Sequence, residues 1–334
     1  MGVPGGAVDL RTGETQPSDP ALYIGRQTVV APAGEGAGHP LWSAFLDEAT
    51  GGDREMQGFL QRLAGYCLTG DVSEEVLTFL YGPGGNGKGV FLGAVAAILG
   101  EYAIASPIEV FTAGSRLNLE YYRAQMAGAR LVTASETEAG ATWAESQIKE
   151  LTGNEAPISG RQPHGRAFTY RPVFKLLLVG NHAPRLKGRT PAMERRLRVV
   201  PFDKEPERPD PKLKDKLRAE YPAILRWMLD GCLEWQRRRL GSAEAIEAAT
   251  SSYFEAQDMF RRWLDERCIV DPTLAIRPSA LQGDFAGWCR ENGEPVVSAS
   301  DFREMAERTR GLRYAKVKGS FWIKGAGLRA LGDD

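Results

Sequence analysis

The sequence has 334 residues, of which 43% are hydrophobic and 25% are charged, proportions typical of a folded globular protein rather than a disordered one. No apolar run approaches the roughly 20 residues that a membrane-spanning helix needs, and the first residues lack the basic and apolar regions of a secretory signal. The four cysteines form no CxxC pair, so neither a disulfide framework nor a zinc site is expected. We therefore expect a soluble protein of the cytoplasm, that of a host cell if a mobile element encodes it.

Basic residues gather in one part of the sequence. The whole chain has 42 lysines and arginines against 43 acidic residues, a formal net charge of −1. Between Arg161 and Arg198, however, ten basic residues accompany a single acid, Glu194. Such a local excess is typical of a surface that meets phosphate groups, although a solvated face whose charge is balanced elsewhere would give the same pattern.

The amino-terminal part divides into two stretches. Residues 1–40 are rich in glycine and proline and have little apolar periodicity, which predicts a flexible tail or linker. Over residues 41–70, apolar residues recur at three- and four-residue spacing, as Trp42, Phe45 and Leu46 do. This spacing predicts a small helical domain of two short amphipathic helices.

Residues 71–206 have the pattern of an α/β core. Four apolar runs predict buried strands, and a helical pattern over 90–99 follows the first of them. The predicted strands are Val76–Tyr81, Arg130–Ser135, Phe174–Gly180 and Arg196–Phe202. Strands separated by helical or longer connections favour a mainly parallel sheet, and the functional residues of such sheets lie beyond the carboxyl ends of the strands.

The carboxyl-terminal part is predicted as two further regions. Apolar stripes at helical spacing make residues 207–270 a helical region. Residues 271–334 have two helical patterns and then two strand-like segments around Gly319. The order helix, helix, ribbon is compatible with a winged-helix module.

The segment from Gly82 to Lys88 matches the pattern GxxxxGK between a predicted strand and a predicted helix, a context that an ordinary glycine-rich turn does not explain. Glycines let backbone N–H groups point at a phosphate, and the lysine reaches the β- and γ-phosphates. We therefore predict a phosphate-binding loop for ATP and Mg²⁺. The predicted nucleotide-binding residues are Gly82, Gly84, Gly85, Asn86, Gly87, Lys88, Gly89 and Val90.

One position departs from the usual pattern of such a loop. The residue after the lysine is normally Ser or Thr, whose hydroxyl binds Mg²⁺, and here it is Gly89. Either a water molecule replaces the hydroxyl, or a carboxylate elsewhere holds the metal. Glu136, after the second predicted strand, is the predicted Mg²⁺ ligand, directly or through water, and Glu138 is the second candidate. The alternative is that these acids only solvate the end of a strand.

Polar residues also mark the other two strands. Asn181 follows the third strand, where a neutral amide can hydrogen-bond the γ-phosphate or the attacking water, or simply form a turn before Pro184. Arg195 and Arg196 precede the fourth strand, and an arginine there could reach the nucleotide of a neighbouring subunit. A surface ion pair is the alternative. The predicted catalytic residues are thus Lys88, Glu136, Asn181 and Arg196.

Residues 157–170 contain a strand-like part, a turn-like part and a second strand-like part, which predicts a hairpin. Arg161, His164 and Arg166 lie near its expected tip. Cations on a projecting loop would hold phosphates without reading the base sequence, so these three residues are predicted to bind nucleic acid.

These segments, in this order, resemble the superfamily 3 helicases, and most closely the helicase part of phage, plasmid and poxvirus primase-helicases. The resemblance extends from about residue 7 to beyond residue 290 and rests on GGNGKG (84–89), RLVTASETE (130–138), IKELTGNEAPISGR (148–161), LLLVGNHAPRL (176–186) and ERRLRVVPF (194–202). It implies an AAA+-like core, ATP hydrolysis at the subunit interfaces of a hexameric ring, and movement on single-stranded DNA at a forked duplex.

The resemblance also assigns roles to individual residues. Lys88 matches the phosphate-loop lysine, Glu136 the main acid of the second motif, Asn181 the polar sensor, and Arg196 the arginine before the last strand. Residues 151–170 match the region that carries a channel hairpin in this superfamily.

Two departures from the family pattern stand at Gly89 and at Ser135, where relatives often have a second acid. The primase half of longer relatives is absent, so a separate primase or replication initiator is a conceivable partner. Two other functions fit the motifs: an ATPase that loads or remodels a replication partner, and a non-enzymatic initiator module that binds ATP and duplex DNA. A small-molecule kinase would have no use for the basic hairpin.

Overall fold

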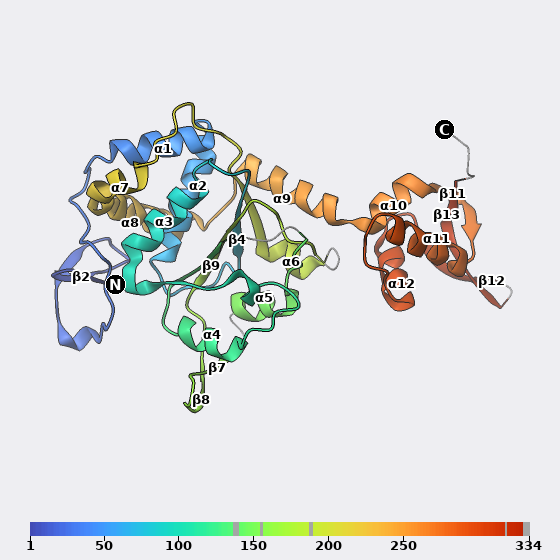
Figure 1. The fold of residues 1–334 in the computed structure, drawn as a ribbon, viewed down its shortest axis with the longest axis horizontal. Helices are drawn as coiled ribbons and strands as arrows, with labels where there is room; N and C mark the ends of the chain where they lie inside the picture. Colours follow the sequence, from blue (N-terminus) through green and yellow to red (C-terminus); the bar gives the residue numbers. More distant parts are fainter. Residues whose placement is uncertain (136–139, 154–155, 187–189, 318, 330–334) are drawn as a thin grey trace. The chain divides into compact units, whose positions relative to one another are not determined.

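The computed structural model describes residues 1–135, 140–153, 156–186, 190–317 and 319–329. The chain divides into two compact units, Met1–Tyr253 and Phe254–Asp334, which can be followed in Figure 1. Among the described residues, no helix has the length and apolar content that crossing a membrane requires.

A parallel sheet of five strands forms the centre of the first unit. Its strands are β4 (Leu77–Tyr81), β5 (Ala103–Ala105), β6 (Leu131–Ser135), β9 (Lys175–Gly180) and β10 (Leu197–Pro201). They lie in the order β10-β4-β9-β6-β5, and every pairing is parallel. The predicted α/β class and parallel sheet are confirmed. The short strand β5 was not predicted, because three residues are too few to form a recognisable apolar run.

Nine α-helices and four short 3₁₀ turns surround this sheet in the part of the first unit that is described. The α-helices are α1 (Pro40–Thr50), α2 (Arg54–Cys67), α3 (Lys88–Leu99), α4 (Leu119–Met126), α5 (Glu145–Thr152), α6 (Pro191–Arg196), α7 (Leu213–Leu217), α8 (Tyr221–Arg238) and α9 (Glu244–Gln257), which ends beyond the division between the units. The 3₁₀ turns are η1 (Pro20–Leu22), η2 (Gly100–Tyr102), η3 (Ile108–Val110) and η4 (Arg218–Glu220).

One hydrophobic core joins helices from three of the predicted regions. The ring of Trp42 in α1 lies 5.2 Å from Phe45, 5.7 Å from Phe91 of α3 and 5.4 Å from Trp227 of α8, measured between centroids. The carboxylate of Glu220 also caps α1, since it accepts hydrogen bonds from the backbone N–H groups of Leu41 and Trp42. Residues 41–70 and the helices up to α8 therefore belong to the same unit as the parallel sheet and are not separate domains.

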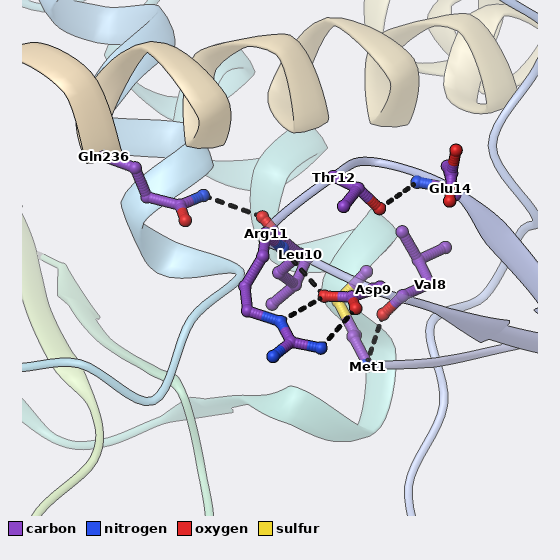
Figure 2. Close-up of polar contacts among 8 residues, drawn as sticks. All are labelled: Met1, Val8, Asp9, Leu10, Arg11, Thr12, Glu14 and Gln236. Atoms are coloured by element: carbon purple, nitrogen blue, oxygen red, sulfur yellow. Dashed lines mark hydrogen bonds and ion pairs between the residues drawn. The ribbon is translucent and has the colours of Figure 1, made fainter.

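The amino-terminal residues differ from the predicted flexible tail. β1 (Gly2–Val3), β2 (Gly6–Val8) and β3 (Thr15–Pro17) form an antiparallel sheet, and Val3 and Val8 belong to the main core. The amide of Gln236 on α8 donates to the carbonyl of Leu10 at 2.7 Å, as Figure 2 shows. Strands of two or three residues are too short to show an apolar periodicity, so they could not be predicted in this glycine-rich sequence.

The second unit has the helix and strand order of a winged helix. It contains α10 (Met259–Arg267), β11 (Cys268–Ile276), α11 (Pro278–Glu291), α12 (Ala299–Arg308), β12 (Arg313–Val317) and β13 (Ser320–Leu328), with the sheet ordered β11-β13-β12. Trp263 of α10 packs against Phe285 and Phe302 in a core of this unit. The unit therefore begins near residue 254 and not at the expected residue 271, because α10 supplies part of its core.

Candidate active site

The predicted phosphate-binding loop joins the carboxyl end of a central strand to the start of a helix. β4 ends at Tyr81 and α3 begins at Lys88, with Gly87 as the residue that caps the helix at φ 88°. The first amides of α3 therefore face the loop, and the helix terminus carries the partial positive charge that favours an anion. This strand–loop–helix arrangement is the one that the sequence predicted.

Lys88 lies inside the loop. Its side chain is buried, and its ammonium donates hydrogen bonds to the carbonyl of Gly82 at 2.7 Å, the carbonyl of Pro83 at 2.5 Å and Oδ1 of Asn86 at 2.8 Å. Burial lowers the pKa of Lys88. The three acceptors compensate part of that cost and hold the ammonium where the loop closes on itself.

Two glycines allow the loop to pack closely on its surroundings. A Cβ on Gly82 would lie 1.9 Å from the carbonyl oxygen of Phe202, and a Cβ on Gly87 would lie 2.7 Å from the ring of Phe45 in α1. Asn86 also donates its side-chain amide to the carbonyl of Phe202. The loop is therefore fixed on one side by the residue that follows β10 and on the other by α1.

The outer part of the loop faces open space. A Cβ on Gly84 or Gly85 would meet no described atom within 4 Å, and Gly84, Gly85 and Gly89 are exposed. The side chain of Val90 packs against the core, so only its backbone can serve a ligand. A phosphate group could approach the amides at this open side.

The described residues contain no cluster of three or more His, Cys, Asp or Glu that could hold a metal. Glu136 and Glu138, the predicted metal-binding acids, lie outside the described residues. Position 89 offers no hydroxyl. The loop thus fits a nucleotide phosphate, whereas the position that usually helps to bind Mg²⁺ supplies no ligand.

Asn181 lies at the same edge of the sheet as the loop. Gly180 of β9 pairs with Tyr81 of β4, so Asn181 and Gly82 leave neighbouring strands at the same level, and Asn181 is exposed. The strand that ends at Ser135 is separated from β4 by β9. The sheet order therefore places the strand of Asn181, and not the strand that precedes Glu136, next to the loop strand.

Arg196 lies at the opposite edge of the sheet. It ends α6, and the next residue, Leu197, pairs with Leu77 at the amino end of β4. One strand of five residues, about 16 Å, therefore separates it from the loop of its own chain.

The guanidinium of Arg196 is held within its own chain. It donates to Glu75 at 3.0 Å, to Thr152 of α5 at 3.2 Å and to the carbonyl of Ala192 at 3.2 Å. We expected this side chain to lean outward, but its side chain is only 14% exposed because Glu75 and Thr152 surround it. Its neighbour Arg195 is the exposed member of the pair.

The predicted hairpin is present. β7 (Ile158–Arg161) and β8 (Ala167–Tyr170) pair antiparallel, and Figure 1 shows the hairpin extending away from the helices around it. Arg161, His164 and Arg166 are exposed at or beside its tip. The hydroxyl of Tyr170 anchors the base by donating to the carbonyl of Arg123 in α4.

A residue that the sequence did not single out lies near the loop. A Cβ on Gly89 would be 3.7 Å from the ammonium nitrogen of Lys214 in α7. The two residues are 125 positions apart (214 − 89), so no local pattern could connect them.

Comparison with known proteins gives a consistent picture. A family described as "Family of unknown function (DUF5906)" matches residues 80–196, which run from the end of β4 to the end of α6. The chain is similar to "Putative helicase 022R" of Frog virus 3 (isolate Goorha), with 25% identity over 273 residues that cover 75% of this chain. It is also similar to "Putative helicase L207/L206" of Acanthamoeba polyphaga mimivirus, with 28% identity over 152 residues, or 45% of this chain.

The match takes in only part of each viral protein, 27% of the first and 16% of the second. Among solved structures, two apo structures of the NrS-1 C terminal region share the fold, with TM-scores of 0.57 and 0.56 at 11% and 12% identity. Both alignments cover 90% of this chain and 78% of the other. The chain is thus similar to parts of two viral proteins named as putative helicases, and it shares the fold of the NrS-1 regions.

Proposed function

We propose that this protein is an ATP-driven DNA helicase of a mobile-element replication system, of the superfamily 3 type. The observation that carries the proposal is the buried Lys88 in a glycine loop between β4 and α3, with Asn181 directly after β9, the strand that pairs with β4. The similarity to viral proteins named as putative helicases supports strand separation as the process that ATP would drive.

In this proposal, the loop amides and the start of α3 bind the β- and γ-phosphates of ATP. Lys88 exchanges its three loop acceptors for phosphate oxygens. Asn181 hydrogen-bonds the γ-phosphate or the attacking water. Glu136 polarises that water and holds Mg²⁺ directly or through water, and the metal, when bound, neutralises charge that develops on the phosphates.

Arg196 acts on a neighbouring subunit in this scheme. It lies at the far edge of the sheet from its own loop, and to reach the nucleotide of another chain its guanidinium would have to leave Glu75 and Thr152. The proposed assembly is a ring, and a hexamer is the form that the superfamily resemblance favours. Single-stranded DNA at a forked duplex would pass the exposed cations of the β7–β8 hairpin, and a separate primase or initiator is a proposed partner.

The first test concerns Lys88. Lys88→Ala should abolish ATP hydrolysis and DNA unwinding, because the loop loses its only side-chain cation among the residues 82–89. Hydrolysis is measured by phosphate release, and folding by thermal unfolding. Arg237→Ala, at an exposed position of α8, is the matched control and should behave as wild type. Wild-type turnover in Lys88→Ala would place the active site elsewhere.

One observation favours a second function, that of an ATPase that loads or remodels a protein partner. The third helix of the winged-helix unit, α12, carries Arg303 paired with Glu307 at 2.8 Å and Arg308 paired with Glu304. This charge-compensated surface has no surplus of cations for DNA phosphates, and it suits a protein better. Stimulation of the ATPase by single-stranded DNA without separation of a forked duplex would favour this function.

A further inference from the structure

Position 89 is open, and a cation reaches toward it. Gly89 follows the loop lysine, where a hydroxyl would usually help to hold Mg²⁺. It is exposed, and a Cβ built there would lie 3.7 Å from the ammonium nitrogen of Lys214. The ammonium therefore lies beside the position at which the metal-binding side chain usually begins.

The helix that carries Lys214 is fixed in place. α7 packs against α3 and α1, and Leu217 is buried in the same core as Phe91 of α3. This packing anchors the backbone of Lys214. Because its side chain is exposed, it can meet a ligand at the start of α3.

The two cations that follow Lys214, Lys216 and Arg218, are already paired. Lys216 forms an ion pair with Asp210 at 2.7 Å, and Arg218 forms one with Asp215 at 3.4 Å. Within the described parts of the chain, no ion pair or hydrogen bond involves the ammonium of Lys214. It is thus the cation of α7 that has charge available for an anion near position 89.

We propose that Lys214 is a phosphate-positioning residue that supplies a second cation to the β- and γ-phosphates of the bound nucleotide, beside the position from which a loop hydroxyl usually helps to hold the metal. This inference rests on the proposed binding of ATP. A glycine at position 89 leaves room for the ammonium, and an ammonium provides one positive charge and three hydrogen-bond donors to phosphate oxygens. Binding of the nucleotide should consequently depend less on a divalent cation than it does in loops with a hydroxyl.

The test measures the dissociation constant of a fluorescent, non-hydrolysable ATP analogue in the full chain, once with Mg²⁺ and once with EDTA. Lys214→Ala should weaken binding roughly tenfold or more, the usual effect of removing a charge-assisted hydrogen bond, and the loss should be larger in EDTA. Lys214→Arg should retain most of the affinity. The matched control is Lys212→Ala, an exposed cation that precedes α7, which should bind as wild type does.

A double variant tests whether a hydroxyl at position 89 can replace the cation of Lys214. Gly89→Ser combined with Lys214→Ala should recover affinity with Mg²⁺ but not with EDTA. If Lys214→Ala binds as tightly as Lys212→Ala in both conditions while Lys88→Ala does not bind, this inference is overturned and the proposed function stands. If the wild-type chain itself binds no analogue, both are overturned.

Discussion

The ammonium of Lys88 has acceptors before any nucleotide arrives. Because it donates hydrogen bonds to Gly82, Pro83 and Asn86, the phosphate of the proposed ATP would have to replace these partners. The contribution of Lys88 to nucleotide affinity would therefore come from replacing two neutral carbonyls and an amide oxygen by anionic oxygens, which make stronger hydrogen bonds. The same contacts give this buried cation the hydrogen-bond partners that it needs.

A second buried lysine, Lys175, affects the stability of the fold and is not part of the candidate active site. Lys175, at the start of β9, is 4% exposed and donates to the carbonyls of Thr69, Asp71 and Val173. Burial lowers its pKa to about 7. In the unfolded chain, Lys175 has its ordinary pKa of 10.5. Between about pH 10.5 and about pH 7 the unfolded chain therefore binds the proton more readily than the fold, so the free energy of unfolding decreases as the pH falls. Below about pH 7 this group causes no further change.

Lys175→Met should therefore remove part of the pH dependence of stability. Between pH 7 and pH 10, the free energy of unfolding of the wild type should rise relative to that of the variant by at most about 1.4 kcal/mol per pH unit. Urea unfolding at several pH values measures the difference, with Lys316→Met, an exposed position, as the control. Parallel curves for wild type and Lys175→Met would show that Lys175 keeps its ordinary pKa in the fold.

Among the elements, the β7–β8 hairpin carries the clearest expectation for nucleic acid. Replacing Arg161 and Arg166 together by alanine should weaken binding of single-stranded DNA equally for all sequences. The slope of log affinity against log salt should fall by roughly one unit for each lost phosphate contact. Fluorescence anisotropy over a salt series measures both. The matched control replaces Arg237 and Arg238 of α8, both 71% exposed, and a sequence-selective loss would count against a channel hairpin.

The elements that could be predicted from the sequence are those with long or continuous apolar patterns. β4, β6, β9 and β10 are four- to eight-residue apolar runs, and α3 follows the glycine loop directly. β5 and the strands β1 to β3 have only two or three residues each. β5 pairs with β6, a distant strand, and the segment after β2 is held to α8 by the contact of Gln236 with Leu10; no local pattern contains such contacts.

The candidate site was predictable only where its parts are contiguous. The strand–loop–helix around Lys88 follows from one motif, and Asn181 follows from the end of one strand. The order of the strands, which places β9 next to β4, and the approach of Lys214 to Gly89 arise from tertiary packing. The ion-pair partner of Arg196, Glu75, likewise comes from a segment 121 residues away.

At the scale of the whole molecule, the position of Arg196 predicts complementation between subunits. Lys88→Ala and Arg196→Ala should each be inactive, and an arginine that acts in trans contributes roughly 10³-fold or more to the rate. In an equal mixture, some interfaces combine an intact Lys88 with an intact Arg196, so ATPase activity should partly return. Subunit exchange is verified with two fluorescent labels. A mixture that exchanges but stays inactive excludes action in trans, and Arg195→Ala tests the exposed neighbour in the same way.

The division into two units predicts where the chain can be shortened. A chain that ends at Gln257 keeps α9 whole and should unfold cooperatively and bind the ATP analogue as the full chain does. A chain that ends at Pro272 keeps α10 without its partners and should aggregate, because Phe260 and Trp263 lose the core formed with Phe285. Light scattering and analogue titration compare the two. Loss of analogue binding in the first would show that the units depend on one another.

The strand β10 has a functional group at each end. Arg196 precedes it, and Phe202, which follows it, touches the phosphate loop through Asn86 and Gly82. β10 is hydrogen-bonded along its length to β4, so in the proposed ring a shift of the loop on nucleotide binding would be passed along the strand to the arginine proposed to serve the next subunit. In the proposed ring, each site would then sense the occupancy of its neighbour. ATP hydrolysis should consequently be cooperative, with a Hill coefficient above one that falls to one when Asn86→Ala frees the strand from the loop.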